Sequence, residues 1–389
     1  MNRPSSAARR VRHDAVRRLH RFLGLALGVW FAVLGLTGAV NVFYWELEEW
    51  GLPPVPEGPS VPLQEAFEVV QAAHPERTGS WMVRLPGPRH DHLWMIYPKP
   101  AESVNKLFAP LQIQMDPVHG TIVRERFWGQ TPWSILYEIH ATLLVGLIDR
   151  EAGRWAFHII ALGGLVLLLS LFAGLMLAWP RSGSGWRRVL SIKRNAHPAR
   201  RNLDLHRTGG LYSLPILALL AISGFAFGYQ RSVLEPLIDL LSPLEADPKG
   251  LVSFPSGGPM LDLDRIVEVA RHRYPGAEVR TIKTPEIAQD VYEVSLRQSG
   301  EIGRQHGQTQ LWLDAYDGTI RAERDPHRNG WGQSLLDLVW PVHSGEFLGL
   351  PGRLLWCASG VMPTLLLVTG YRHWRRKQRK RHLAADPLQ

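Results

Sequence analysis

Two histidines, His20 and His206, begin the same short sequence motif, or phrase, at two places in the chain. The first phrase reads His20-Arg-Phe-Leu-Gly-Leu and the second reads His206-Arg-Thr-Gly-Gly-Leu. Each follows a basic segment and leads into a long apolar run. A phrase that recurs in the same setting indicates an internal duplication. We therefore expect two equivalent halves, each with a histidine at the same edge of an apolar helix.

A second pair of histidines, His140 and His343, recurs in the same way. A Gly-Gln pair precedes each of them at the same spacing, and a Gly-Arg pair follows each and leads into the next apolar run. The duplicated chain therefore offers one histidine pair at each end of its apolar runs.

Paired histidines in a helical bundle are suited to holding haem. A neutral imidazole is a good ligand for iron, and two facing rings can bind one haem iron from both sides. Helix bundles commonly hold such cofactors in their interior. Duplication also copies residues that only cap helices or lie at a membrane surface. From the spacing alone, a protein that binds two haems and a protein that binds no cofactor are therefore equally open alternatives.

His158 is a further candidate, because it lies inside the second apolar run. Ionisable residues at membrane depth are functional candidates. Alignment of Trp155 with Trp356 places Ser359 opposite His158, so the repeat supplies no partner for it. His158 either replaces His140 as the ligand on the outer side or forms a hydrogen bond with a haem propionate. We favour the second role.

The outer loops hold further histidines and tryptophans. Five histidines are expected to be solvent-exposed: His90, His92, His119, His306 and His327. Four tryptophans are candidates for a surface that faces a haem edge or a metal chelate, or for an interfacial belt: Trp128, Trp133, Trp331 and Trp340.

Four apolar runs would position these residues. They cover 22–45, 155–180, 206–230 and 353–372. A helix that rises about 1.5 Å per residue needs about 20 residues to cross the hydrocarbon of a bilayer. The sequence therefore predicts an α-helical membrane protein with four transmembrane helices.

Basic residues flank these runs on one side only. The segments 1–21, 181–207 and 372–389 contain half of the 44 Lys and Arg residues but few acidic ones. The positive-inside rule places the N-terminus 1–21, the loop 181–205 and the tail 373–389 in the cytoplasm. Contact with the lipid bilayer accounts for this basic charge, so no nucleic acid partner is expected.

The two outer segments repeat one pattern. Residues 60–127 and 260–325 each begin with an amphipathic helix and continue with short strands. The turn Asp116-Pro-Val-His-Gly-Thr-Ile recurs as Asp314-Ala-Tyr-Asp-Gly-Thr-Ile, with glycine at the left-handed position. Interfacial helices are expected at 130–150 and 331–350. The pattern in each half thus predicts a small α+β domain.

Other chemistry has little support in the sequence. The chain lacks the glycine fingerprints of nucleotide-binding folds and the His-Glu-x-x-His motif of zinc proteases. Its only cysteine, Cys357, lies in the fourth run and permits no intramolecular disulfide. If the protein carries electrons, they must come from another protein or a small reductant.

With these motifs assembled, the chain resembles the PepSY-associated transmembrane (PepSY-TM) proteins, an iron-regulated inner-membrane group that includes ferrisiderophore reductases. The resemblance covers roughly 15–376. It rests on the following positions: His20-Arg-Phe-Leu-Gly-Leu, His140 with Gly146, Gly153 and Arg154, Trp179-Pro180-Arg181, Asp204-Leu-His206-Arg, and His343 with Gly349, Leu350, Pro351, Gly352 and Arg353.

The resemblance implies a bacterial inner-membrane protein with two periplasmic PepSY-like domains and two haem b groups. His20 and His206 would ligate the inner haem, and His140 and His343 the outer one. Electrons from an unidentified cytoplasmic or membrane donor would reduce a ferric siderophore or another Fe(III) chelate. Some relatives carry a flavin reductase module, which this chain lacks, and often two tryptophans where this chain has Trp179 alone.

Two rival functions remain. One is a haem-free regulator whose PepSY-like domains bind a peptidase or a sensor. The other is a haem-containing electron-transfer subunit that serves a separate oxidoreductase. A transporter is less well supported, because the four apolar runs contain no Asp, Glu, Lys or Arg within their central parts to couple ion movement.

Overall fold

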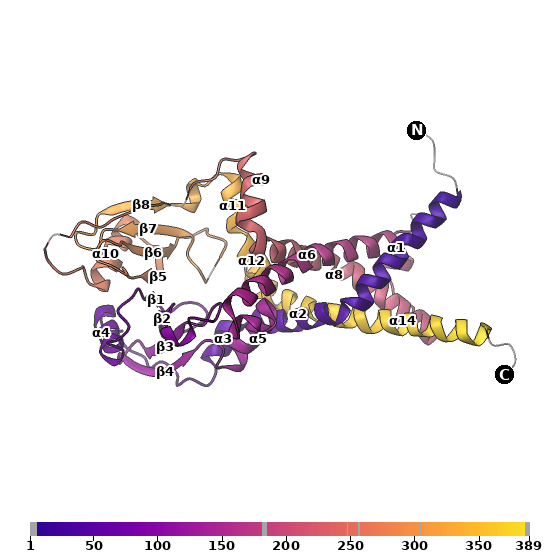
Figure 1. Cartoon of the computed structure of the whole chain (residues 1–389), viewed down its shortest axis with the longest axis horizontal. Helices are drawn as coiled ribbons and strands as arrows, with labels where there is room; N and C mark the ends of the chain where they lie inside the picture. The colour runs from indigo at the N-terminus through magenta and orange to yellow at the C-terminus, as the bar shows by residue number, and fades with distance from the viewer. Residues whose placement is uncertain (1–5, 181–184, 247, 256, 304, 386–389) are drawn as a thin grey trace. The chain divides into compact units, whose positions relative to one another are not determined.

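The computed structural model describes residues 6–180, 185–246, 248–255, 257–303 and 305–385 (Figure 1). The basic segments 1–21, 181–205 and 373–389 each lie partly outside these residues. The chain forms two compact units. The helix unit contains the chain up to Val42, His158–Tyr229 and the chain from Leu350 on; the sheet unit contains Phe43–Phe157 and Gln230–Gly349.

Long helices build the helix unit. They are α1 (Ser6–Ala26), α2 (Gly28–Asn41), α6 (Arg150–Ala178), α8 (Pro198–Tyr229), α13 (Gly349–Gly360) and α14 (Met362–Ala385), with the short α7 (Gly185–Val189). Among the described residues, three helical stretches are long and apolar enough to cross a membrane: Arg150–Ala178, Pro198–Asp239 and Glu346–Lys380. By length and composition these helices are suited to a membrane, as the sequence indicates.

The first predicted span, 22–45, is not one straight helix. His13–Ala26 and Gly28–Asn41 meet at an angle of 58°, and they make a fourth crossing only if the bent pair is one span. Gly24 and Gly28 flank the break. Glycine is a poor helix former and a common cause of kinks, which accounts for the bend at this position.

Glycines permit close contacts between the helices of this unit. A Cβ atom at Gly35 would lie 2.3 Å from the carbonyl oxygen of Gly360, and one at Gly164 would lie 2.3 Å from that of Ala221. Real side chains do not fit at such distances. These glycines therefore let α2 approach α13 and α6 approach α8, which is the usual role of small residues between membrane helices.

In the described part of the sheet unit, one antiparallel sheet has eight strands in the order β4-β3-β2-β1-β5-β6-β7-β8. The strands are β1 (Met82–Arg84), β2 (Leu93–Tyr97), β3 (Leu111–Asp116), β4 (Thr121–Phe127), β5 (Glu278–Lys283), β6 (Tyr292–Arg297), β7 (Thr309–Leu313) and β8 (Ile320–Arg324).

The two repeats share this sheet, whereas the sequence pattern suggests two separate small domains at 60–127 and 260–325. In Figure 1, β1 of the first repeat lies beside β5 of the second. Met82 pairs with Lys283 and Arg84 with Thr281. Each strand would otherwise be an open edge with unpaired backbone groups. Pairing of the two edges satisfies both and joins the repeats.

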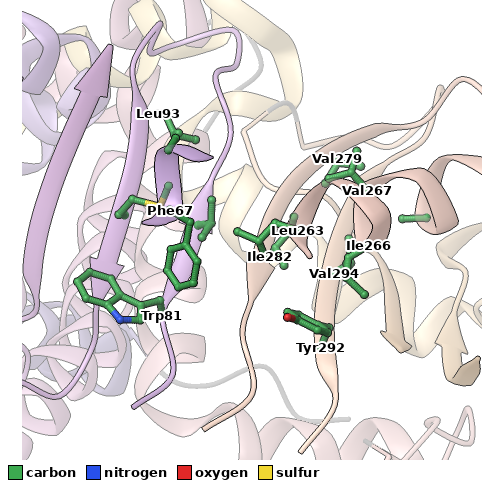
Figure 2. Packing of buried hydrophobic residues seen from close by; sticks show 14 of the residues in the cluster. Phe67, Trp81, Leu93, Leu263, Ile266, Val267, Val279, Ile282, Tyr292 and Val294 are labelled. Atoms are coloured by element: carbon green, nitrogen blue, oxygen red, sulfur yellow. The ribbon is translucent and has the colours of Figure 1, made fainter. Parts of the chain in front are cut away.

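One hydrophobic core serves both repeats. The helices α4 (Leu63–Ala73) and α10 (Leu263–Arg273) contribute apolar side chains to it, among them Phe67 and Ile266 (Figure 2). The carboxylate of Asp264 on α10 accepts hydrogen bonds from the first backbone N–H groups of α4, at Leu63 (2.9 Å) and Gln64 (3.0 Å). An acidic group at a helix N-terminus stabilises that helix, so each repeat supports the other.

The repeated turns have the predicted conformation. Asp116 and Asp314 each accept hydrogen bonds from backbone N–H groups two and three residues later. The glycines of the two turns, Gly120 and Gly318, have φ values of 66° and 73°. Glycine adopts this left-handed conformation without steric cost, so the predicted role of both glycines is confirmed.

The predicted interfacial helices 130–150 and 331–350 are broken. The first is α5 (Pro132–Thr142) followed by η2 (Val145–Leu147); the second is α11 (Trp331–Asp337), α12 (Val339–Ser344) and η5 (Glu346–Leu348). Further short helices are α3 (Tyr44–Glu49), η1 (Ala101–Ser103), η3 (Gln230–Leu234), α9 (Glu235–Asp239) and η4 (Pro326–Arg328). Left-handed residues end α5 at Leu143 (φ 53°) and α12 at Gly345 (φ 72°).

Candidate functional site

His20 and His206 face one another within the helix unit. Their ring centroids lie 6.1 Å apart at an interplanar angle of 72°. Nδ1 of His20 lies 3.0 Å from the carbonyl oxygen of Ser170, and Nδ1 of His206 lies 3.1 Å from that of Leu366. A carbonyl oxygen only accepts hydrogen bonds, so each Nδ1 donates and each Nε2 keeps its lone pair. Both rings are thus in the tautomer that binds a metal through Nε2.

A glycine borders each of these rings. Gly174 follows Ser170 on α6 at the same spacing as Gly370 follows Leu366 on α14. A Cβ atom would lie 3.0 Å from Cε1 of His20 at Gly174, and 3.2 Å from Cε1 of His206 at Gly370. The same contacts, a carbonyl and a glycine, therefore position the histidine in both halves of the duplicated chain.

The separation of the two rings fits axial ligation of one metal. An imidazole nitrogen binds a transition metal at about 2.0 Å, so two rings on opposite sides of one ion have centroids roughly 6 Å apart. Within the residues that the structure describes, no group of three or more His, Cys, Asp or Glu side chains forms a metal cage. Each pair offers two nitrogens, which is what the axial positions of a haem require.

His140 and His343 form an equivalent pair in the sheet unit. Their ring centroids are also 6.1 Å apart, at an interplanar angle of 60°. His140 lies in the last turn of α5 and His343 in the last turn of α12. Leu143 and Leu144 continue the chain after α5 with φ values of 53° and 69°. Left-handed leucines are strained, and such strain is found mainly where structure serves a site.

Buried polar contacts fix α5 beneath His140. Glu138 is 3% exposed and accepts hydrogen bonds from Nε1 of Trp128 (2.8 Å) and the hydroxyl of Thr142 (2.7 Å). Trp128 is itself only 5% exposed and packs against Tyr137. The expectation that Trp128 presents a surface to a ligand is therefore wrong; this ring supports the helix from inside.

The other three candidate tryptophans are more accessible. Trp331 and Trp340 are 56% and 36% exposed. Trp133 stacks on Trp50, with ring centroids 6.1 Å apart. Trp340 lies one helical turn before His343 on α12, and its ring centroid is 5.7 Å from that of His306.

His158 has a different environment. Its ring lies 5.5 Å from that of Tyr229 on α8, and the Tyr229 hydroxyl donates to the backbone carbonyl of His158 (3.3 Å). The structure thus places a tyrosine ring beside His158 and places His140 opposite His343. The ring that faces His343 within the sheet unit is thus that of His140.

Three outer histidines are not exposed, contrary to expectation. His90 and His92 are each 3% exposed, and His306 is partly buried. Burial lowers the pKa of His90 to about 4 and that of His306 to about 3. Sequence reasoning placed them in solvent because they lie in loops. His90 and His92 are covered by Trp45, Glu49 and Trp94, and His306 contacts Arg84 and Trp45 of the other repeat; no local pattern shows these contacts.

A comparison with the curated proteins finds no match. The family model of the PepSY-associated TM region matches residues 17–377, nearly the whole chain. The matched segment includes both histidine pairs and the whole sheet unit. The chain therefore belongs to the PepSY-associated TM family of membrane proteins.

Proposed function

We propose that this protein is a di-haem reductase that passes electrons to a ferric siderophore or another Fe(III) chelate and releases Fe(II). The observation that supports this proposal most is the pair of matched histidine sites, each with ring centroids 6.1 Å apart. Covalent haem attachment uses a Cys-x-x-Cys-His motif, and this chain has a single cysteine. Non-covalently bound haem b is therefore the cofactor that we propose.

The residues of the chain would act mainly by holding and orienting the cofactor. Nε2 of His20 and His206 would ligate the inner haem, while the carbonyls of Ser170 and Leu366 keep the rings in the ligating tautomer. His140 and His343 would ligate the outer one. Haem bound at these sites would supply one-electron transfer. Each electron taken from the donor converts one chelated Fe(III) to Fe(II), which hard oxygen ligands hold less tightly.

The charge distribution supports an orientation. The basic segments 1–21, 181–205 and 373–389 would lie in the cytoplasm of a bacterial inner membrane, and the sheet unit in the periplasm. The chain shows no nucleotide-binding fingerprint of its own. The electron donor would therefore be a cytoplasmic or membrane-bound reductant, and the chelate would be reduced at the periplasmic side.

A reduced-minus-oxidised visible spectrum with haem quantitation on detergent-purified protein tests the cofactor. We expect about two low-spin haems per chain, and a loss of about one in His206→Ala and in His343→Ala. His272→Ala is the matched control, because His272 is exposed on α10. Well-folded protein that contains no haem despite ample haem supply would contradict the proposal and would favour the haem-free regulator.

Anaerobic mixing tests the substrate. Dithionite-reduced protein, freed of excess reductant, is mixed with ferric siderophores and simple ferric chelates, and reoxidation of the haem is followed by absorbance. Reoxidation with stoichiometric Fe(II) release is the expected result. Haem-containing protein that no ferric chelate reoxidises, and that co-purifies with another oxidoreductase, would instead be an electron-transfer subunit.

A further inference from the structure

Arg84, at the end of β1, is a cation of the sheet unit that pairs with no carboxylate among the described residues. Its Cζ atom lies 4.4 Å from the ring centroid of Trp45, and its Nη1 lies 3.4 Å from Nδ1 of His306. Its Nε is buried and has no hydrogen-bond partner within the part of the chain that the structure describes. Among the described residues, no Asp or Glu forms an ion pair with Arg84.

Other buried arginines of the same unit do have acidic partners. Nη2 of Arg126 lies 2.6 Å from the carboxylate of Glu48, and Nη2 of Arg89 lies 2.9 Å from that of Glu346. Buried charges are normally paired, because an uncompensated charge in a low-dielectric interior is costly. Arg84 departs from the pattern that its own neighbours follow.

The imidazoles around Arg84 do not neutralise its positive charge. Burial lowers the pKa of Arg84 to about 10, so the guanidinium remains charged at neutral pH. Burial and the charges of Arg84 and Arg89 lower the pKa of His306. Burial and the charges of Arg84 and Arg280 lower that of His90, against the opposing charge of Glu49. The two imidazoles are therefore neutral at neutral pH and are not counter-ions. Nδ1 of His90 already contacts the carbonyl oxygen of His92 and Nδ1 of His306 faces Arg84, so Nε2 is the remaining hydrogen-bonding atom of each ring.

Aromatic rings border the same group. Trp45 covers one face of the Arg84 guanidinium, and its ring centroid is 5.5 Å from that of His90. Trp340 contacts His306 and is 36% exposed. A planar guanidinium with an unfilled donor, bordered by flat rings, suits a planar oxyanion, and carboxylate is the oxyanion that guanidinium matches in geometry.

We propose that Arg84, together with His306 and Trp340, binds a carboxylate group of a ligand in the sheet unit. Trp340 lies one turn before His343 on α12, so this site is next to one histidine of the outer pair. Two sources have the same chemistry: a carboxylate-bearing ferric chelate from solution, or a propionate of haem held by His140 and His343. The assignment to either source rests on the proposed function; the carboxylate site itself does not.

Iron-free citrate is the probe for a ligand from solution. Its binding to the detergent-purified full chain is measured by calorimetry and by the fluorescence of the site tryptophans, in wild type, Arg84→Gln, Arg84→Lys and Arg265→Gln. Loss of a charge-assisted hydrogen bond predicts binding about tenfold to a hundredfold weaker in Arg84→Gln. Arg84→Lys keeps the positive charge but loses the planar pair of N–H donors, so its affinity for citrate should lie between those of wild type and Arg84→Gln. Arg265→Gln, on the exposed surface of α10, should bind like wild type.

Outer haem content and midpoint potential are the readouts for a propionate. If the haem supplies the carboxylate, citrate does not bind, and Arg84→Gln changes the content or potential of the outer haem while the inner haem is unchanged. The proposal is overturned if Arg84→Gln alters neither citrate binding nor the outer haem. Citrate binding requires no electron transfer. A protein without haem would therefore refute the proposed function, and the citrate measurement would still test the carboxylate site. The thermal midpoint of each variant shows that the chain is folded.

Discussion

A side chain at Gly370 is expected to prevent binding of the inner haem that we propose, because this glycine borders the ring of His206. A Cβ atom there would lie 3.2 Å from Cε1 of the histidine. Carbon atoms in contact prefer separations of about 3.5–4.0 Å, so even alanine requires a shift of a few tenths of an ångström. Metal–ligand bonds tolerate deviations of only about 0.2 Å. Valine adds two further methyl groups, and the displaced imidazole should no longer reach the iron.

The assay is haem quantitation per chain together with the visible spectrum of Gly370→Val. The expected result is one low-spin haem instead of two, with a smaller loss in Gly370→Ala. Gly258→Val is the control, because Gly258 is exposed, lies in the sheet unit away from the inner pair in sequence, and a Cβ there meets no atom within 4 Å. Two haems with an unchanged low-spin spectrum in Gly370→Val would show that His206 does not hold iron in the observed rotamer.

Two further predictions concern the sheet unit. Arg89→Ala should lower the free energy of unfolding by about 3 kcal/mol, because it removes the cation beside the 1% exposed carboxylate of Glu346. Chemical denaturation should show a change below about 1 kcal/mol for Arg265→Ala, whose pair with Glu268 is exposed. Burial lowers the pKa of His306 from 6.5 to about 3. As pH falls, the imidazole is therefore protonated in the unfolded chain before it is protonated in the folded protein. Stability should fall as pH drops from 6.5 towards 3, and His306→Gln should flatten the pH dependence of the thermal midpoint.

The local pattern of apolar and charged residues was enough to predict much of the helix unit. Apolar runs without charges correspond to the helices α6 and α8, and the recurrent phrases lead to histidines whose rings face each other. Such features are local. The apolar pattern of a helix can be recognised from its own residues, and a duplication repeats that pattern. The contact of Gly370 with His206 was not predictable, because the register of one helix against another depends on packing along their whole lengths.

Long-range pairing is what the sequence could not show. The strands β1 and β5 were each predictable, but their pairing joins residues about two hundred positions apart. Arg84 and His306 meet only because the two repeats share one sheet and one core. Charged and imidazole side chains in loops are normally solvated. A prediction based on that tendency fails at the residues that tertiary contacts bury.

The two kinds of site differ in their symmetry, and this difference supports different roles. Each histidine pair takes one equivalent residue from each half, and the inner pair repeats its carbonyl and glycine contacts as well. Such symmetry suits a cofactor that both halves must hold in the same way. The group around Arg84 combines unlike residues: Arg84 and Trp45 come from the first half, and His306 and Trp340 from the second. A duplicated chain diverges where it must recognise an asymmetric ligand, so the Arg84 group is where differences in carboxylate specificity should arise.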